Sequence, residues 1–312
     1  MRVLITGCSG FLGPFLVDHL TGTGKDMEIA GITEVRDYES PKIKVFHVDI
    51  RNREAVFSAV EEVKPELTFH LAAISNVGFS WEHQKLTYEI NFIGSSNLFE
   101  ALSECSPGSR VLLMSSAELY GRSAEDLMDE TTPTSARNPY ALSKKAMEML
   151  GDIYAEAGKL DVIKVRSFNF TGPGQDRKFV ASDFSYQIAQ IEKGKRKPVM
   201  HVGNLSAVRD ISDVRDIARY LTIIGEKGEN RGLYNLCSGK TYSIQDVLDI
   251  LLSLSTEKIA VMVDPDKFRP IDVPRLAGDN RRIRESFGLQ AEYKIQKTLS
   301  DLLNYWRKKV GD

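Results

Sequence analysis

The most constraining feature of the sequence lies in its first twenty residues, where an apolar strand pattern meets a glycine-rich turn and then an apolar helix pattern. Arg2 to Thr6 has the apolar composition of a buried strand, and Phe11 to Leu20 has helical periodicity. Between them the chain reads Gly-Cys-Ser-Gly-Phe-Leu-Gly, residues 7–13. A strand, a glycine turn and a helix in this order are typical of a dinucleotide-binding βαβ unit.

Each glycine of this turn has a separate physical role. Gly7 permits the tight turn, Gly10 lets the backbone approach a diphosphate, and Gly13 lets the helix pack closely on the strand. The N–H groups and the positive dipole end of the following helix attract the anion. We therefore predict that a dinucleotide contacts Gly7, Gly10, Phe11, Leu12 and Gly13.

Short apolar runs alternate with amphipathic stretches through the first half of the chain. This alternation predicts an α/β fold, a doubly wound parallel sheet of the Rossmann type with helices on both faces. The expected strands are Arg2–Thr6, Glu28–Ile32, Lys44–Val48, Leu67–Leu71, Arg110–Ser115 and Asp161–Arg166. The expected helices are Phe11–Leu20, Glu54–Val63, Tyr88–Cys105 and Tyr140–Gly158.

After about Ser167 the rhythm changes to turn-rich segments between isolated helices and short strands. We expect residues 1–167 to form the dinucleotide-binding domain and residues 168–312 to form mainly a smaller C-terminal α/β lobe for the substrate, although later segments can return to the first domain. Helices of the second part are expected at Val180–Lys193, Val214–Glu226, Ile244–Ser253 and Ile295–Lys309.

Composition argues against several classes of protein. The 312 residues include 41 Lys+Arg and 43 Asp+Glu, for a formal net charge of −2, so a basic surface for nucleic acid is not expected. The cysteines, Cys8, Cys105 and Cys237, are too few and too far apart for a disulfide framework or a metal cluster. No apolar run approaches the roughly 20 residues that cross a bilayer, and the first residues lack the features of a signal peptide. We expect a cytoplasmic chain with no metal and no membrane contact.

The end of the second predicted strand bears on the choice of cofactor. Glu34 can accept hydrogen bonds from ribose hydroxyls, and its charge repels a 2′-phosphate, which favours NAD. Arg36 argues for NADP, because a guanidinium there can clamp that phosphate. Both residues can equally be solvated loop charges. The sequence therefore predicts NAD or NADP, with a slight preference for NAD.

The third and fourth predicted strands end in residues suited to the same ligand. Asp49 and Ile50 close the third strand, where a carboxylate can meet the adenine amino group. Leu71, Ala72 and Ala73 close the fourth strand, where small side chains let a cofactor lie against the backbone. Because parallel strands end at one edge of the sheet, we expect all five residues to contact the cofactor.

Tyr140 and Lys144 are four residues apart at the start of a predicted helix, which places both side chains on one face. A phenol with a pKa of about 10 is a poor acid or base at neutral pH, but an adjacent ammonium and an oxidised nicotinamide lower that pKa. Lys144 can also bond the nicotinamide ribose. We predict that Tyr140 exchanges a proton with the substrate and that Lys144 assists it.

Ser116 and Glu118 follow the fifth predicted strand, at the sheet edge where a doubly wound fold binds its ligands. Ser116 can hydrogen-bond a substrate carbonyl or hydroxyl and so steady the oxygen that exchanges a proton with Tyr140. Glu118 can act as a second acid or base, or it can be a charge at a helix N-terminus or on the surface.

Together these segments resemble one family, the extended short-chain dehydrogenase/reductases that act on nucleotide sugars. The matching segments occur in that family's order and approximate spacing, and they are Gly7–Gly13, Leu71–Ala73, Asn91–Asn97, Ser116 and Tyr140–Lys144. The segments Arg166–Gln175 and Val202–Asp210 look most like those of GDP-4-keto-6-deoxymannose reductases. Phe268–Pro274 is similar to a segment that those reductases share with GDP-mannose 4,6-dehydratases. The resemblance covers nearly the whole chain.

The resemblance implies further site residues. Asn91 would belong to the cofactor site, and Ser75 and Asn169 to the sugar site, with Asn169 near the diphosphate. Arg209 and Arg269 match the family's diphosphate-binding arginines, and their forks suit a dianionic diphosphate. Without the resemblance, Arg209 would be interpreted as half of a surface ion pair. The nucleotide's entrance would be formed by Lys178 and Val180.

The function implied by the resemblance is reduction of the C4 ketone of an NDP-4-keto-6-deoxyhexose with NAD(P)H, with GDP-4-keto-6-deoxymannose as the favoured substrate. Tyr140 would donate the proton and Ser116 would polarise the ketone. Alternatives are a 4,6-dehydratase of the GDP-mannose type or a 4-epimerase with tightly held NAD(P), and a non-catalytic nucleotide sensor, which the complete Ser116, Tyr140 and Lys144 set disfavours.

Two residues depart from the family pattern. Dehydratases of this group usually carry Thr at the position of Ser116, and the most similar reductases tend to carry a basic residue at that of Glu34. The resemblance also implies a homodimer formed through the helices expected at Tyr88–Cys105 and Tyr140–Gly158. The apolar residues Leu98, Met147 and Leu150 can serve that contact or the core.

Overall fold

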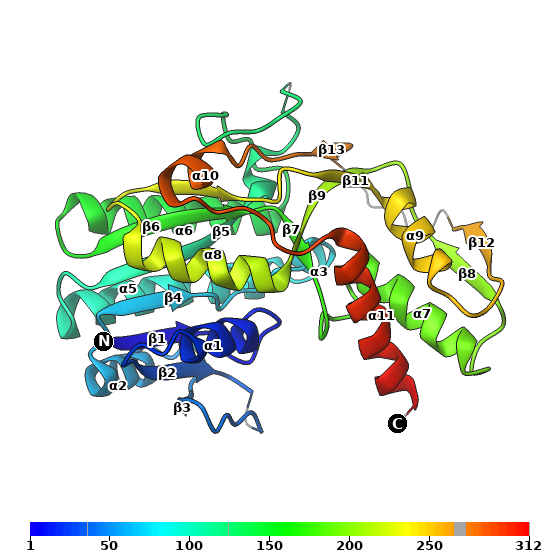
Figure 1. The fold of residues 1–312 in the computed structure, drawn as a ribbon. Coiled ribbons are helices and arrows are strands. Elements are labelled where there is room, and N and C mark those ends of the chain that lie inside the picture. Colours follow the sequence, from blue (N-terminus) through cyan, green and yellow to red (C-terminus); the bar gives the residue numbers. More distant parts are fainter. Residues whose placement is uncertain (36, 124, 265–272, 312) are drawn as a thin grey trace.

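Seven parallel strands form the main sheet of the computed structural model, which describes residues 1–35, 37–123, 125–264 and 273–311 (Figure 1). Their order is β10-β6-β5-β4-β1-β2-β3, and every neighbouring pair is parallel. The strands are β1 Arg2–Thr6, β2 Glu28–Thr33, β3 Lys44–His47, β4 Leu67–His70, β5 Arg110–Ser116, β6 Asp161–Ser167 and β10 Leu233–Leu236. The predicted fold class is confirmed, and the direction of strand addition switches between β1 and β4.

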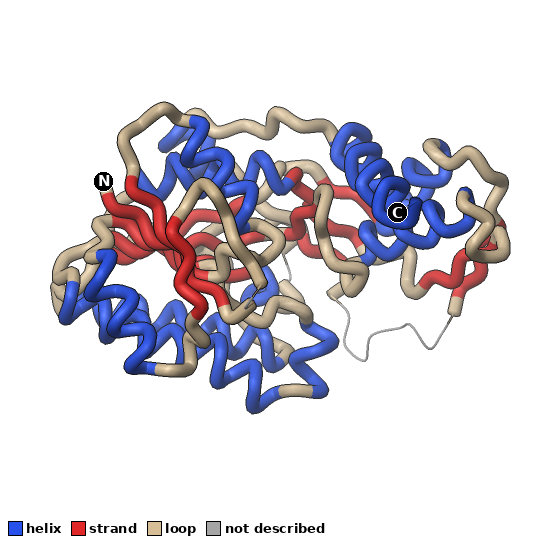
Figure 2. The backbone as a smooth tube through the Cα atoms, turned by 90° about the horizontal axis from the view of Figure 1, so that it is seen from below, coloured by secondary structure: helices blue, strands red, loops and turns tan. Residues whose placement is uncertain are grey.

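Helices cover both faces of this sheet because its strands are apolar on both faces. Alternate residues of β1 point to opposite sides, so that Val3 and Ile5 join one core cluster and Leu4 joins the other. Figure 2 shows the sheet between the two helix layers. The first layer contains α1 Gly13–Gly22, α8 Val214–Lys227 and α10 Arg281–Phe287, and the second contains α2 Arg53–Val63, α5 Gly94–Cys105 and α6 Pro139–Glu156.

A smaller lobe, to the right of the main sheet in Figure 2, has its own apolar core. Three helices pack together there, α7 Val180–Glu192, α9 Ile244–Ser253 and α11 Ile295–Gly311. Its strands are β7 Asn169–Thr171, β8 Val199–Val202, β9 Val208–Asp213, β11 Thr241–Ser243, β12 Ala260–Val263 and β13 Arg275–Leu276. No helix among the described residues combines the length and the apolar character needed to span a bilayer.

The first helix begins later than its periodicity suggests. The sequence predicted a helix from Phe11, but α1 begins at Gly13. The preceding residues belong to the glycine turn, in which the N–H of Gly13 donates to the carbonyl oxygen of Gly10 at 3.2 Å. The first helical turn therefore points its amino end at the edge of the sheet, next to the turn.

The predicted helix at Tyr88–Cys105 is interrupted. The structure instead has α4 Gln84–Tyr88, a π-helix η1 Glu89–Ile93 and then α5, and it adds a short helix, α3 Val77–Glu82. A π-helical turn inserts one extra residue per turn, so apolar periodicity does not reveal it. Such turns are frequent near functional sites, and this one carries Asn91.

Helix α8 was predicted as part of the second lobe, which is wrong. It packs on α1 and against the main sheet, and its buried residues Ile217, Leu221 and Ile224 complete the core on that face (Figure 1). Strand β10, which follows it, pairs in parallel with β6. A parallel strand requires a crossover connection, and α8 provides it. The division at residues 167 and 168 remains a prediction.

Candidate active site

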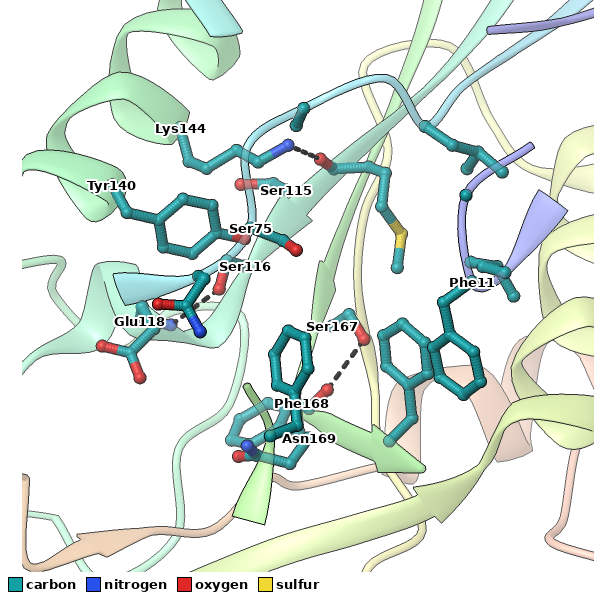
Figure 3. Close-up of a pocket in the computed structure, with 18 of the residues that line it drawn as sticks. Phe11, Ser75, Ser115, Ser116, Glu118, Tyr140, Lys144, Ser167, Phe168 and Asn169 are labelled. Atoms are coloured by element: carbon teal, nitrogen blue, oxygen red, sulfur yellow. Dashed lines mark hydrogen bonds between the residues drawn. The ribbon is translucent and has the colours of Figure 1, made fainter. Parts of the chain in front are cut away.

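Two adjoining cavities open where the main-sheet strands end. The first, of about 270 Å³, lies between the glycine turn and the start of α6 (Figure 3). The second, of about 320 Å³, extends into the smaller lobe. Both are lined by Glu118, Asn169, Phe170, Gln175 and Phe179. Because they share these walls, they form one continuous site at the topological switch point, where doubly wound folds bind ligands.

The glycine turn has the geometry expected of a diphosphate cradle. Gly7 has a φ of +71°, and a Cβ there would lie 2.8 Å from the backbone nitrogen of Ala72. A Cβ on Gly13 would lie 2.2 Å from the carbonyl oxygen of Cys8. Both positions therefore require glycine for the fold itself. A Cβ on Gly10 would meet only the carbonyl oxygen of Gly7, at 3.2 Å, so its free side faces the cavity.

The start of α1 is open to an anion. Its N-cap residue, Leu12, provides no side-chain acceptor for the first N–H groups of the helix. Leu12, Phe11 and the three glycines of the turn all line the first cavity. These residues fit a dinucleotide, because the bare cradle and the amino end of the helix match a diphosphate in shape and charge.

Tyr140 and Lys144 reach the opposite wall of the same cavity (Figure 3). Helix α6 starts just before them, because the side chain of Asn138 accepts a hydrogen bond from the N–H of Ala141 at 2.8 Å and Pro139 occupies the first turn. Both side chains are buried, with exposed fractions of 7% and 2%. The Lys144 ammonium lies 6.0 Å from the centre of the Tyr140 ring.

The electrostatics of this pair differ from the sequence prediction. Burial raises the pKa of Tyr140 to about 12, while a hydrogen bond with Ser116 opposes that rise and the charge of Glu118 adds to it. The expectation that the neighbouring ammonium lowers this pKa is therefore wrong for the protein alone. Burial also lowers the pKa of Lys144 to about 7, against the attraction of Glu148. Desolvation therefore dominates the pKa of both residues.

Ser116 and Glu118 stand where β5 turns into a short 3-10 helix, η2 Ala117–Tyr120. The Ser116 hydroxyl accepts a hydrogen bond from the N–H of Glu118 at 3.2 Å and faces Tyr140 (Figure 3). The Glu118 carboxylate accepts a hydrogen bond from the side chain of Asn138 at 3.1 Å. Glu118 is half-buried and lines both cavities, so it is not a simple surface charge.

Half of the other expected site residues also line the cavities. The first cavity contains Leu71, Ala73, Ser75 and Asn169, and the second contains Asn169, Lys178, Val180 and Arg209. Arg209 is buried on β9, and one of its guanidinium nitrogens donates to the carbonyl oxygen of Val208 at 2.9 Å. Arg209 is therefore not a surface residue, in contrast to its interpretation without the resemblance.

Several expected cofactor residues do not line either cavity. The N–H of Ala72 donates to the hydroxyl of Thr6 at 3.2 Å. Ile50 is buried in the core. The Asn91 carboxamide holds the backbone of Ile74, accepting from its N–H at 2.7 Å and donating to its carbonyl oxygen at 3.0 Å. Ala72 and Asn91 thus hold the loop after β4 through these hydrogen bonds without lining the cavity themselves.

The adenine end of the expected site is only partly described. The Asp49 carboxylate forms a two-pronged ion pair with Arg51, with contacts of 3.0 and 2.6 Å, and these hydrogen bonds lower the pKa of Asp49. Glu34 is exposed just after β2. Arg36 and Arg269 lie outside the described residues. The contacts of these four residues with a ligand stay predictions.

The structure also adds residues that the sequence did not single out. The carbonyl oxygen of Met114 accepts a hydrogen bond from Lys144 at 2.7 Å. Further lining residues of the first cavity are Asn76, Val77, Ser115, Ser167, Phe168, Phe170, Gln175, Phe179 and Leu276. Further lining residues of the second cavity are Arg177, Asp183, Phe184, His201 and Asn204. Ser167 directly follows the strand predicted at Asp161–Arg166, which was a usable signal, whereas most of the others meet only where the two lobes adjoin.

Comparison with known proteins gives a consistent result. A family model described as GDP-mannose 4,6 dehydratase matches residues 4–302. The GDP-6-deoxy-D-mannose reductase of Pseudomonas aeruginosa is 28% identical over 100% of this chain and 99% of its own length. The GDP-6-deoxy-D-talose 4-dehydrogenase of Aggregatibacter actinomycetemcomitans is 28% identical over 92% of each chain.

Solved structures show the same relationship. RMD from Pseudomonas aeruginosa complexed with NADPH superposes with a TM-score of 0.88, at 27% identity and 99% coverage of each chain. The UDP-glucose 4-epimerase of Thermus thermophilus in complex with NAD also gives 0.88, at 27% identity, with 98% of this chain and 99% of that one covered.

Proposed function

Since this chain belongs to the GDP-mannose 4,6 dehydratase family of extended short-chain dehydrogenase/reductases, we propose that it reduces the C4 ketone of an NDP-4-keto-6-deoxyhexose with NAD(P)H, and that GDP-4-keto-6-deoxymannose is the substrate. The observation that carries the proposal is one cavity lined by the glycine turn and by Ser116, Tyr140 and Lys144. A hydride donor and a sugar ketone need to meet beside a proton donor, and the lining of this cavity supports such a meeting.

The chain's own residues supply the proton and the orientation, while the reduced nicotinamide supplies the hydride when it is bound. Burial raises the pKa of Tyr140 to about 12, so at neutral pH the phenol carries a proton that it can donate to the forming alkoxide. The Ser116 hydroxyl donates a hydrogen bond to the ketone oxygen and polarises it. Lys144 supports the phenolate that remains and holds the nicotinamide ribose.

We assign the second cavity to the nucleotide sugar. A diphosphate carries two negative charges, and Arg209 and Lys178 provide cations in the walls. Asn169 lines both cavities, so it can contact the sugar where the nucleotide sugar meets the cofactor. Ser75 lines the first cavity, where the sugar ring would meet the nicotinamide.

A 4,6-dehydratase or a 4-epimerase is the second candidate, and Glu118 is compatible with it as well as with the reductase. This carboxylate reaches both cavities beside Ser116, where it can act as a second acid or base. Such enzymes oxidise C4 and later return the hydride, so they need no added reductant.

Two incubations separate the candidates. In the first, purified protein receives the keto sugar with NADH or NADPH, and stoichiometric loss of the reduced cofactor supports the reductase. In the second, it receives GDP-mannose alone, and a new keto product without added reductant overturns the reductase in favour of the dehydratase. Thermal-shift screening against GDP, UDP, dTDP and CDP sugars tests the base.

The choice of cofactor also belongs to this proposal. The exposed carboxylate of Glu34 directly after β2 repels a 2′-phosphate, which slightly favours NAD over NADP. Fluorescence titration with NADH and NADPH tests the preference, and Glu34→Gln should improve NADPH binding relative to NADH. Both cofactors are available in the cytoplasm, where we propose that the chain works.

We further propose that the chain forms a homodimer through α6 and α5. The apolar side chains of Leu142, Met149 and Ile153 on α6 are more than half exposed, and Ile93, just before α5, is nearly half exposed. Apolar patches of this kind are typical of interfaces. Leu98 and Met147 are instead fully buried in the core, so they do not form this contact.

A further inference from the structure

Helix α6 carries a third buried side chain on the face that bears Tyr140 and Lys144. Glu148 is four residues beyond Lys144, so its side chain is one turn further along the same face. Its exposed fraction is 3%, close to the 2% of Lys144. A carboxylate this deeply buried is costly unless it is paired and hydrogen-bonded.

The partner of Glu148 is Arg166, on β6. The guanidinium forms two parallel contacts with the carboxylate, from Nε at 2.9 Å and from Nη2 at 2.8 Å. Both side chains are almost completely buried, and the guanidinium also lies 4.9 Å from the centre of the Tyr120 ring. Two-pronged contacts of this kind fix the position of a carboxylate as well as its charge.

We propose that Glu148, held by Arg166, is a positioning residue that acts through Lys144 and keeps its ammonium charged beside Tyr140. This inference rests on the proposed function, because Lys144 must be cationic to support the phenolate that remains after proton transfer. The pair does not touch the substrate and acts through Lys144.

The charged groups around Lys144 support this assignment. Burial lowers the pKa of Lys144 to about 7, and Glu148 is the attraction that opposes this shift. Burial alone would raise the pKa of Glu148, but the hydrogen bonds and charge of Arg166 outweigh that effect, so the pKa is lowered. His70, on β4, is fully buried with a pKa lowered to about 3, so it is neutral and adds no charge. Tyr140 is also neutral at pH 7, because its own pKa is raised to about 12.

A purely structural role, tying α6 to β6, is the competing explanation. One turn further along α6, Asp152 forms an ion pair with Lys164 of the same strand. That ion pair also connects α6 to β6, but the Asp152 carboxylate is 41% exposed. Asp152 is not among the groups that shift the pKa of Lys144. Asp152→Asn is therefore a matched control for Glu148→Gln.

The test is the pH dependence of kcat for keto-sugar reduction. Activity should fall as the pH rises through about 7, because Lys144 loses its proton there. In Glu148→Gln this fall should move to lower pH by about one unit or more, because an opposite charge has been removed. Asp152→Asn should leave the pH of this fall unchanged. Glu148→Asp keeps the carboxylate, so its shift should be smaller than that of Glu148→Gln. An unmoved midpoint in Glu148→Gln overturns the inference, whereas a wild-type protein without turnover overturns the proposed function instead.

A second measurement does not depend on activity. Glu148→Gln leaves Arg166 buried and unpaired, which can prevent folding, so the double variant Glu148→Gln/Arg166→Met removes both charges. Wild type and the double variant are each compared, across pH, with the same protein carrying Lys144→Met. The difference in unfolding free energy within each pair reports the stability that comes from Lys144. The pH at which this difference begins to rise should be lower for the double variant than for wild type. The same pH in both backgrounds would show that Glu148 does not act on Lys144.

Discussion

Lys144 and Met114 join α6 to the end of β5, because the buried ammonium donates a hydrogen bond of 2.7 Å to the backbone carbonyl oxygen of Met114. Ser116 follows two residues later on the same strand, and Tyr140 precedes Lys144 by one helical turn. This bond therefore ties the strand that would hold the ketone to the helix that would supply the proton. It has consequences for activity and for stability.

Replacing Tyr140 with Phe should lower turnover by at least about a hundredfold while leaving cofactor affinity nearly unchanged, because only the proton donor is lost. Steady-state kinetics and fluorescence titration of NAD(P)H check the two parts. Tyr120→Phe is the matched control, since its hydroxyl is also buried but bonds Asn235 at 2.7 Å outside the cavities. Equal turnover of Tyr140→Phe and wild type would remove the acid from this mechanism.

Burial of Lys144 predicts a distinct pH dependence of stability. Its pKa is about 7 in the folded protein and 10.5 when unperturbed, so between these values the unfolded chain binds a proton that the folded chain has released. Stability from this group therefore rises with pH through that range, and below about pH 7 the desolvation cost is present in full. The unfolding free energy of wild type relative to Lys144→Met should rise from pH 7 to pH 10. A flat or falling difference in urea titrations would contradict this.

Gly13→Ala should destabilise the protein by about 1–3 kcal/mol or more, because the added Cβ would lie 2.2 Å from the carbonyl oxygen of Cys8. Gly22, at the other end of α1, has nothing within 4 Å of the corresponding position. Gly22→Ala should therefore be neutral or stabilising by up to about 1 kcal/mol. Chemical denaturation of the two variants measures the contrast, and a similar loss in both would mean that the turn can relax.

Arg209→Met should weaken binding of GDP by about 10–100-fold, as expected for loss of a charge-assisted contact to phosphate. Isothermal titration with GDP measures it, and NAD(P)H affinity should not change. Arg53→Met, which removes an exposed arginine paired with Glu100 far from the cavities, serves as the control. Unchanged GDP affinity in Arg209→Met would place the diphosphate elsewhere.

Ile153→Glu should convert the proposed dimer to monomer, because it places a charge in the exposed apolar stripe of α6. Light scattering after size-exclusion chromatography gives the mass directly. Val263→Glu, at an equally exposed apolar position on β12, is the control and should not change the mass. A monomeric wild type would refute the proposed dimer.

Much of the main domain was predictable because the relevant signals are local. The boundaries of β1 follow from its apolar residues, and the need for glycine at Gly7 follows from the turn between β1 and α1. Tyr140 and Lys144 were paired by their helical spacing, because four residues along a helix bring two side chains together wherever the helix lies. The π-helix before α5 was missed because apolar periodicity does not record it.

The sequence by itself determined which residues have the right chemistry and which neighbours share a helix face or a strand end. Only the tertiary structure decided that α8 returns to the main sheet, that Arg166 meets Glu148, and that Tyr140 holds its proton more tightly than a free phenol. The physical reason is range. Spacing and backbone geometry act over a few residues, whereas desolvation depends on every segment that packs around a group, however distant along the chain.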